Sequence, residues 1–325
     1  MVAAALLAVT TMAACSSDEL PSAAADEDSR TSPTASGPST SALTGLPADA
    51  GVTTGPLLVA KIDNTASATP QLGLDEADLV VEELVEGGAT RLAAFFQSAY
   101  PEEVGPVRSM RATDIGIVPA GDDTRIVTSG AAGRTIERIT AAGIEYVEEG
   151  ASGFFRAEGR RLPYDLFADL EVVADEVDGD GERPADYLPW GEHEAYASGA
   201  GAASIDVTFS PRHTTSWELD GGGYVIDGGY AEDGFAADTV ITVEVEVVDA
   251  GYLDPAGNPV PESLFEGTGA ATVFHGGRAV AATWSKDAED ASVGFTTADG
   301  AALTVPPGRT WIELVPADTG DVSYR

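Results

Sequence analysis

The chain has 325 residues, and its 54 acidic and 17 basic side chains give a formal net charge of -37 at neutral pH. A field this negative repels nucleic acid and anionic lipid surfaces, so neither is an expected partner for the bulk of the chain. With 43% hydrophobic residues, the chain is long enough for two domains with buried cores.

The chain begins with an apolar run, MVAAALLAVTTMAAC, that ends in small residues and the only cysteine, Cys15. Such a run is typical of a secretory signal peptide and is too short to span a bilayer. The step Ala13-Ala14-Cys15 resembles the lipobox of bacterial lipoproteins, in which the cysteine is lipidated. We therefore expect a lipoprotein signal peptide at residues 1–15. We also expect membrane anchoring through lipid on Cys15, on the extracytoplasmic face of the cell membrane.

Residues 16–54 are rich in Ser, Thr, Ala, Pro and Asp and contain few large apolar side chains. A segment of this composition buries too little apolar surface to offset the entropy of ordering it. The sequence therefore predicts a disordered tether between the lipid anchor and the folded part.

Strand and helix patterns alternate over residues 55–196, which predicts an α+β or α/β domain. A short apolar run within Gly55–Asn64 suits a buried strand. In ADLVVEELVEGGATRLAAFFQ, two apolar runs flank Gly87-Gly88, which favours a hairpin, although Leu79–Val85 as a helical turn is the alternative. Further on, TRIVTSG and IEYVEEG suit strands on either side of a helix in GRTIERITAAG.

The pattern changes in residues 204–325, where short β-branched or aromatic segments are separated by Gly, Asp or Pro. TVITVEVEVV alternates valines with Glu244 and Glu246, the period-two pattern of a strand with one solvated face. Eight such segments without a helical stretch predict an all-β, mainly antiparallel second domain. They are IDVTFS, TSWELD, GGYVI, TVITVEVEVV, AATVFHGG, RAVAATWS, SVGFTT and TWIELVP.

Scarce arginines gather near Gly-Gly and Gly-Pro corners. Guanidinium groups are suited to carboxylate or phosphate oxygens, and nearby acidic and amide side chains offer complementary groups. If one strand ran through Glu82 and Glu86, their even separation would place them on one face. Lys61 and Asp63 share a face at the carboxyl end of a strand, where ligand clefts often open. The candidate ligand-binding residues are Asp63, Asn64, Gln71, Glu82, Glu86, Arg91, Arg108 and Arg111.

Three interpretations of this cluster are open. It could be a buried ion-pair network that holds the hairpin to the domain. It could instead be an anion-binding cleft for a cell-wall fragment, a peptide carboxylate or a phosphate-bearing polymer. A third interpretation is an enzyme that uses Glu82 or Glu86 as a general acid or base, with an arginine on the developing charge.

We expect no metal and no cofactor. His193 lies between Glu192 and Glu194, but adjacent side chains point to different sides, and His213 and His275 are far away in the sequence. No strand is followed by G-x-G-x-x-G or a P-loop pattern.

Several motifs resemble the two regions of the DUF3048 family. VAKIDN, PQLGLDEADLVVEELVEGGATRLAAFFQS and GPVRSMR resemble its N-terminal region, and GTGAATVFHGGRAVAATWSK and GRTWIELVP resemble its C-terminal region. The resemblance implies a two-part, extracytoplasmic and often lipid-anchored protein, and it implies no reaction. The chain departs from the family pattern at Pro163-Tyr164-Asp165 and within Tyr224–Gly234, which puts any site built there in doubt.

From these features we expect a cell-envelope-associated binding or scaffolding module. Its partner would be a cell-wall component or an envelope protein. The alternative is a hydrolase or transferase that acts on an envelope polymer with a glutamate as acid or base.

Overall fold

A computed structural model of the chain describes residues 39–121, 123–177 and 181–325. Contacts divide the chain into two compact units, Met1–Gly37 and Pro38–Arg325. The described residues all belong to the second unit. The expected signal peptide, Cys15 and residues 16–38 of the expected tether lie outside the described residues.

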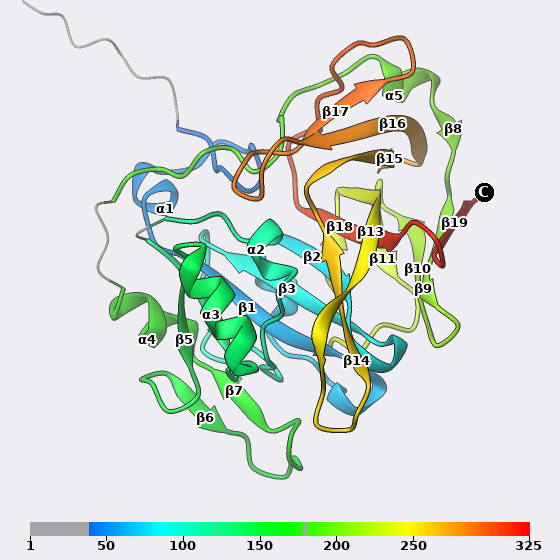
Figure 1. Ribbon diagram of the computed structural model, residues 1–325. Helices are drawn as coiled ribbons and strands as arrows, with labels where there is room; N and C mark the ends of the chain where they lie inside the picture. The colour runs from blue at the N-terminus through cyan, green and yellow to red at the C-terminus, as the bar shows by residue number, and fades with distance from the viewer. Residues whose placement is uncertain (1–38, 122, 178–180) are drawn as a thin grey trace, which may run out of the picture. The chain divides into compact units, whose positions relative to one another are not determined.

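A mixed sheet carries the first half of this unit (Figure 1). Within it, β1 runs antiparallel to β3 and parallel to β4, and β4 runs parallel to β5. The predicted hairpin is confirmed, because β2 and β3 pair antiparallel around a turn in which Gly87 and Gly88 have φ of 72° and 77°. The strands are β1 (Leu57–Asn64), β2 (Leu79–Leu84), β3 (Thr90–Phe96), β4 (Thr124–Thr128) and β5 (Glu145–Glu148).

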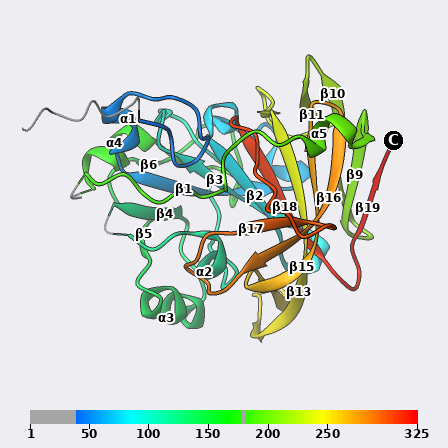
Figure 2. The same cartoon turned by 90° about the horizontal axis from the view of Figure 1, so that it is seen from above.

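The predicted helix is confirmed as α3 (Gly133–Ala141). Its Ile136 and Ile139 pack into the core, and Gly143, with φ of 74°, follows its end. Figures 1 and 2 place α3 and α2 on the same side of β1 to β5. The other helices are short: α1 (Ala50–Thr53), α2 (Asp114–Ile117), α4 (Leu170–Asp175) and α5 (Ala195–Ser198), with 3₁₀ turns η1 (Ala66–Ala68), η2 (Leu74–Glu76) and η3 (Glu86–Gly88).

All eight strand segments predicted in the second half are confirmed. In TVITVEVEVV the valines Val243 and Val245 are buried while Glu244 and Glu246 are exposed, as the alternation predicts. These strands are β9 (Ser204–Ser210), β10 (His213–Asp220), β11 (Gly223–Ile226), β13 (Thr239–Leu253), β15 (Gly267–His275), β16 (Arg278–Lys286), β17 (Gly294–Thr297) and β18 (Thr310–Pro316).

Strands from both halves join one sheet. Most pairs in the second half are antiparallel, but β18 lies between β13 and β2 and runs parallel to both. The sheet order is β17-β16-β15-β13-β18-β2-β3-β1-β4-β5, and it crosses the boundary predicted between residues 55–196 and 204–325. That division into two domains stays a prediction, and the structure describes both segments as parts of one unit.

The sequence pattern did not indicate six of the described strands, most of them very short. Two of them form a small hairpin, β6 with β7, and the other four pair with strands of the two larger sheets. They are β6 (Phe154–Arg156), β7 (Leu166–Ala168), β8 (Ala200–Gly201), β12 (Ala236–Ala237), β14 (Pro259–Leu264) and β19 (Asp321–Tyr324). The short helices α1, α4 and α5 were not indicated either.

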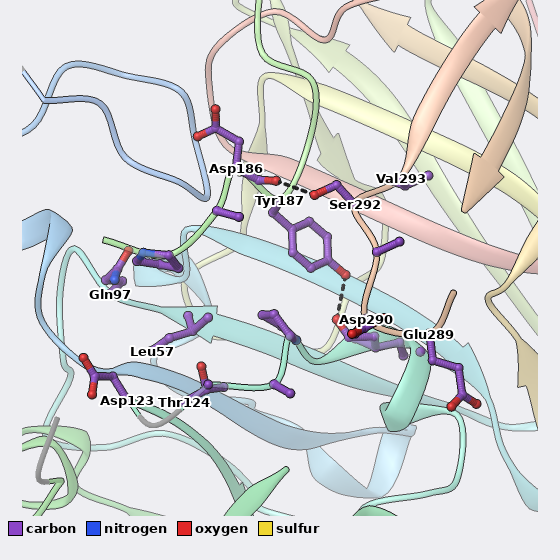
Figure 3. Close-up of a pocket in the computed structure, with 18 of the residues that line it drawn as sticks. Leu57, Gln97, Asp123, Thr124, Asp186, Tyr187, Glu289, Asp290, Ser292 and Val293 are labelled. Carbon is purple, nitrogen blue, oxygen red and sulfur yellow. Dashed lines mark hydrogen bonds between the residues drawn. The ribbon is translucent and has the colours of Figure 1, made fainter. Parts of the chain in front are cut away.

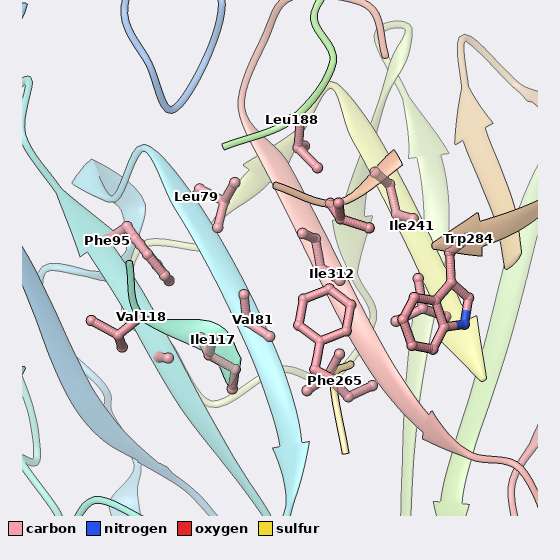
Figure 4. Packing of buried hydrophobic residues seen from close by; sticks show 14 of the residues in the cluster. Leu79, Val81, Phe95, Ile117, Val118, Leu188, Ile241, Phe265, Trp284 and Ile312 are labelled. Carbon is pink, nitrogen blue, oxygen red and sulfur yellow. The ribbon is translucent and has the colours of Figure 1, made fainter. Parts of the chain in front are cut away.

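A second sheet, in the order β12-β11-β10-β9-β19, covers the opposite face of the mixed sheet. All eight residues of β1 are buried, so each face of that strand needs its own apolar layer. Leu57 and Val59 join the cluster on the side of α2 and α3, part of which Figure 4 shows. Leu58 and Ala60 join the cluster shared with the second sheet.

The described end of the expected tether, residues 39–54, packs onto the folded part. Leu43 is 1% exposed, and the indole nitrogen of Trp190 donates to the carbonyl oxygen of Ala42. Among the described residues, no helix combines the length and apolar composition needed to span a bilayer.

Candidate functional site

Strand geometry divides the candidate residues between the two faces of the sheet. Arg91 of β3 lies between Asp63 of β1 and Glu83 of β2 in register, whereas Asn64, one residue further along β1, lies opposite Thr90. The expectation that Glu82 and Glu86 share a face is wrong. The strand β2 ends at Leu84, and Glu86 lies in the turn η3, so the two carboxylates are not on one continuous strand.

A sealed ion network lies below the arginines. Lys61 Nζ is 2.7 Å from Glu83 Oε1 and 2.6 Å from Asp114 Oδ1, and all three side chains are 0% exposed. Burial raises the pKa of Glu83, and the Lys61 ammonium only partly offsets this effect because Asp114 opposes it. Since no solvent reaches these groups, they are closed to a ligand, and none of the three residues is among the eight candidates.

The other charged candidates on this face form what we call the arginine cluster: Arg91, Arg108, Arg111, Asp63 and Glu86. Arg111 Nη2 is 2.6 Å from Glu86 Oε1, and Arg108 Nε is 3.4 Å from Asp63 Oδ2. The side chains of Arg111 and Arg108 are 12% and 23% exposed, so solvent reaches both. The cluster therefore combines three guanidinium groups with two carboxylates, and Arg108 and Arg111 reach solvent whereas Arg91 is buried.

An extended segment after Gly105-Pro106 positions two of these arginines. The backbone N–H of Arg108 donates to the carbonyl of Lys61 in β1, and the backbone N–H of Ser129, after β4, donates to the carbonyl of Arg108. The segment therefore lies between the carboxyl ends of two parallel strands. Arg91 and Arg111 both donate to the carbonyl oxygen of Ser109, at 2.8 and 3.3 Å, which brings their guanidinium groups together.

The electrostatic environment of Arg91 disfavours its charged form. Burial, with the positive charges of Arg111 and Arg108, lowers its pKa to about 10, even though Asp63 and Glu86 act in the opposite direction. The residue is 5% exposed, and its Nε–H is buried without a hydrogen-bond partner. A buried donor on a cation carries an energetic cost that a bound anion would remove.

On the opposite face, Glu82 is the centre of a second network. It is 0% exposed, and Oε1 is 2.7 Å from His213 Nε2 and accepts from Asn64 Nδ2 at 2.9 Å. Thr215 Oγ1 donates to the same carboxylate. Burial raises the pKa of Glu82, but the hydrogen bond and charge of His213 outweigh it and leave this pKa below its usual value. Gln71 completes the network by donating to Asn64 Oδ1.

A second glutamate lies directly beside Glu82. Glu313 of β18 is in register with Glu82 and accepts from Trp217 Nε1 at 2.9 Å. Burial and then the adjacent charge of Glu82 raise the pKa of Glu313 well above its usual value. The pair therefore holds one ionised and one neutral carboxyl group, and this arrangement avoids two buried like charges.

The sequence reasoning grouped residues that the structure separates. The arginine cluster contains five of the eight candidates, and Asn64, Gln71 and Glu82 belong to the network on the other face. That reasoning also missed His213 and Glu313. A signal was present, because Glu82 and Glu313 are each surrounded by apolar residues in VVEELV and TWIELV, which indicates buried carboxyl groups that need partners.

The described surface also has a cavity of about 320 Å³ away from these networks (Figure 3). It lies beside Leu57 and Thr124, which begin β1 and β4, whereas the arginine cluster lies at the carboxyl ends of those strands. Tyr187 closes one side by donating to the carbonyl oxygen of Ile117 at 2.9 Å. None of the candidate residues lines this cavity.

Comparisons with known proteins give consistent matches. The family model described as "Protein of unknown function (DUF3048) N-terminal domain" matches residues 43–183, and the corresponding C-terminal domain model matches residues 205–312. "Putative lipoprotein YerB" of Bacillus subtilis (strain 168) is 26% identical over 290 residues, which cover 84% of this chain and 85% of that protein.

A crystal structure of the YerB protein from Bacillus subtilis has the same fold. It superimposes with a TM-score of 0.71 at 23% identity and covers 87% of this chain and 99% of that chain. The family resemblance seen in the sequence motifs is thereby confirmed.

The sealed network generates a prediction about stability. Lys61→Met should lower the free energy of unfolding by about 3–5 kcal/mol, because it leaves two buried carboxyl groups without their cation. Glu83→Gln should cost about 1 kcal/mol or less, since Glu83 already favours its neutral form. Urea unfolding of both variants measures the difference, and equal losses would contradict the assignment.

The His213–Glu82 pair generates a prediction about pH. Burial lowers the pKa of His213, but Glu82 outweighs it and raises this pKa above its usual value. The folded state therefore binds this proton more tightly than the unfolded state, and the stabilisation is complete below about pH 6.5. The stability advantage of the wild type over His213→Gln should shrink as the pH rises through the raised pKa. An advantage that is constant from pH 6 to 9 would rule this out.

Proposed function

This chain belongs to the DUF3048 family, and we propose that it is a lipid-anchored, extracytoplasmic protein whose folded part binds an anionic group of a cell-envelope component. The observation that carries the proposal is the arginine cluster. It gathers two partly exposed arginines, Arg108 and Arg111, beside the buried Arg91 in a chain with a formal net charge of -37. Asp63 and Glu86 neutralise only part of this local charge, and a bound anion would offset the remaining positive charge.

The geometry favours a carboxylate or a phosphate group as the ligand. Guanidinium groups present paired N–H donors that match both anions. The hydroxyl groups of Ser109 and Ser129, 3.2 Å apart, lie beside the cluster and offer further donors. The negative charge elsewhere on the chain repels an anion at long range, so contacts within the cluster must supply the affinity and offset this repulsion.

The enzymatic alternative finds less support. Glu82 is fully buried, and its partners are His213, Thr215 and Asn64 rather than an arginine. Glu86 is next to an arginine, but it is already paired with Arg111 at 2.6 Å. An anion-binding role, in contrast, does not need an unpaired carboxylate at Glu82 or Glu86.

The lipid anchor rests on the sequence and on the relative. The lipobox-like step Ala13-Ala14-Cys15 follows an apolar run, and the curated relative carries the name "Putative lipoprotein YerB". Both features support a location on the extracytoplasmic face of the cell membrane.

Removing a guanidinium from the cluster should weaken anion binding. Arg108→Gln and Arg111→Gln should each reduce the affinity for inorganic phosphate or acetate by about tenfold or more, because each removes charged hydrogen bonds. The free energy of unfolding should change by only about 0.5 kcal/mol, since both side chains are partly exposed. Isothermal titration and urea unfolding measure the two effects.

Arg138→Gln is the matched control, because Arg138 also pairs with a carboxylate, Glu262, but lies in α3 outside the cluster. Its affinity for both anions should equal that of the wild type. The proposal fails if neither anion binds the wild type, or if all three variants lose affinity equally.

Lipidation predicts a change in cellular distribution. Cys15→Ala should move the protein from the membrane fraction to the soluble extracytoplasmic fraction, because the chain then lacks the acceptor thiol. Fractionation followed by mass spectrometry of the N-terminal peptide measures this. Membrane retention of the variant to the same extent as the wild type would contradict the lipid anchor.

A further inference from the structure

A cavity of about 130 Å³ lies where the second sheet meets the carboxyl end of β1. Its lining combines polar residues, among them Asn64, His213 and Asp227, with apolar ones such as Ile226 and Phe235. The arginine cluster contributes none of its residues to this lining. The cavity is therefore distinct from the anion site proposed above.

His213 is held at this cavity in a fixed orientation. Its Nε2 is 2.7 Å from Glu82 Oε1 and lies 3.0 and 3.2 Å from the hydroxyl oxygens of Thr90 and Thr215. Phe209 packs edge-on against the ring, with the centroids 5.9 Å apart. Among the hydrogen bonds of the described residues, none involves Nδ1 of His213, so this nitrogen is left for a ligand.

The charge state of Glu82 determines what Nδ1 offers. Hydrogen bonds from Asn64 and Thr215 hold Glu82 as a carboxylate, so Nε2 of His213 carries a hydrogen that it donates to Glu82. Glu313, the other carboxyl group nearby, favours its neutral form. When His213 is protonated, Nδ1 therefore carries the second N–H and can donate to a ligand oxygen.

Other lining residues supply a hydrogen-bond acceptor and apolar surface. Asp227 contributes a carboxylate, which accepts hydrogen bonds from N–H or O–H groups, and it is an exposed residue in the loop after β11. Leu74, Ile226 and Phe235 supply apolar surface. The Nδ1–H donor of His213, the acceptor of Asp227 and an apolar wall in a small volume match a secondary amide with a methyl group.

We propose that this cavity is a second ligand site, which takes an acetamido group. The carbonyl oxygen accepts from Nδ1 of His213, the amide N–H faces Asp227, and the methyl group contacts the apolar wall. The ion pair between His213 and Glu82 leaves no excess positive charge beside the cavity, so an uncharged ligand suits it better than an anion.

NMR titration tests this directly, because the chain has only three histidines, His193, His213 and His275. Two probes carry the acetamido group, N-acetylglucosamine and N-acetylalanine methylamide, and they distinguish a sugar source from a peptide source. At pH 6, at least one probe should shift the ring signals of His213 and leave those of the other two histidines unchanged. The affinity should fall about tenfold or more as the pH rises through the pKa of His213, because the Nδ1–H donor is lost.

Variants separate binding from folding. His213→Gln should abolish binding, and Asp227→Asn should weaken it without affecting stability, because Asp227 is exposed. His193→Gln, outside the cavity, and Arg108→Gln, in the arginine cluster, should bind like the wild type. If His213→Gln does not fold, Asp227→Asn carries the test alone. The proposal is overturned if neither probe shifts His213, or if the affinity does not depend on pH or on Asp227.

Discussion

Both proposed sites depend on the side-chain alternation of β1, which is buried on both faces over its whole length. Lys61 and Asp63 point to the side of α2, whereas Asn64 points to the second sheet. Each polar side chain must find partners within its own layer, because neither face of the strand meets solvent. The strand thus creates two separate polar networks that are one residue apart in the sequence, and a one-residue register shift would exchange their partners.

The two polar networks reduce the energetic cost of buried charge in different ways. Below the arginines, Lys61 lies between two carboxyl groups, and at Glu82 and Glu313 one carboxyl group stays neutral. Both arrangements approach local neutrality within the protein. The arginine cluster does not, because its three guanidinium groups outnumber its two carboxylates. The proposed anion site rests on this excess of positive charge.

Much of the fold follows from local sequence patterns, because period-two alternation and glycine turns act over a few residues. The hairpin at Gly87-Gly88, the helix α3 and the eight later strands are examples. The parallel insertion of β18 between β13 and β2 could not be predicted, since it depends on contacts between segments more than 200 residues apart. The contact between Glu82 and His213 was also missed, because it too joins segments that are far apart in the sequence. The grouping of Glu82 with Glu86 failed because β2 ends at Leu84, before the alternation reaches Glu86.

The central claim is that the arginine cluster receives an anion from outside the chain. A crystal structure of the protein grown with selenate, a phosphate mimic that scatters anomalously, tests this claim most directly. We expect an anomalous peak within hydrogen-bond distance of the guanidinium groups of Arg91, Arg108 and Arg111. Selenate found only elsewhere, with these three groups bonded only to Asp63, Glu86 and the carbonyl oxygens of Ser109, Met110 and Pro163, would contradict it.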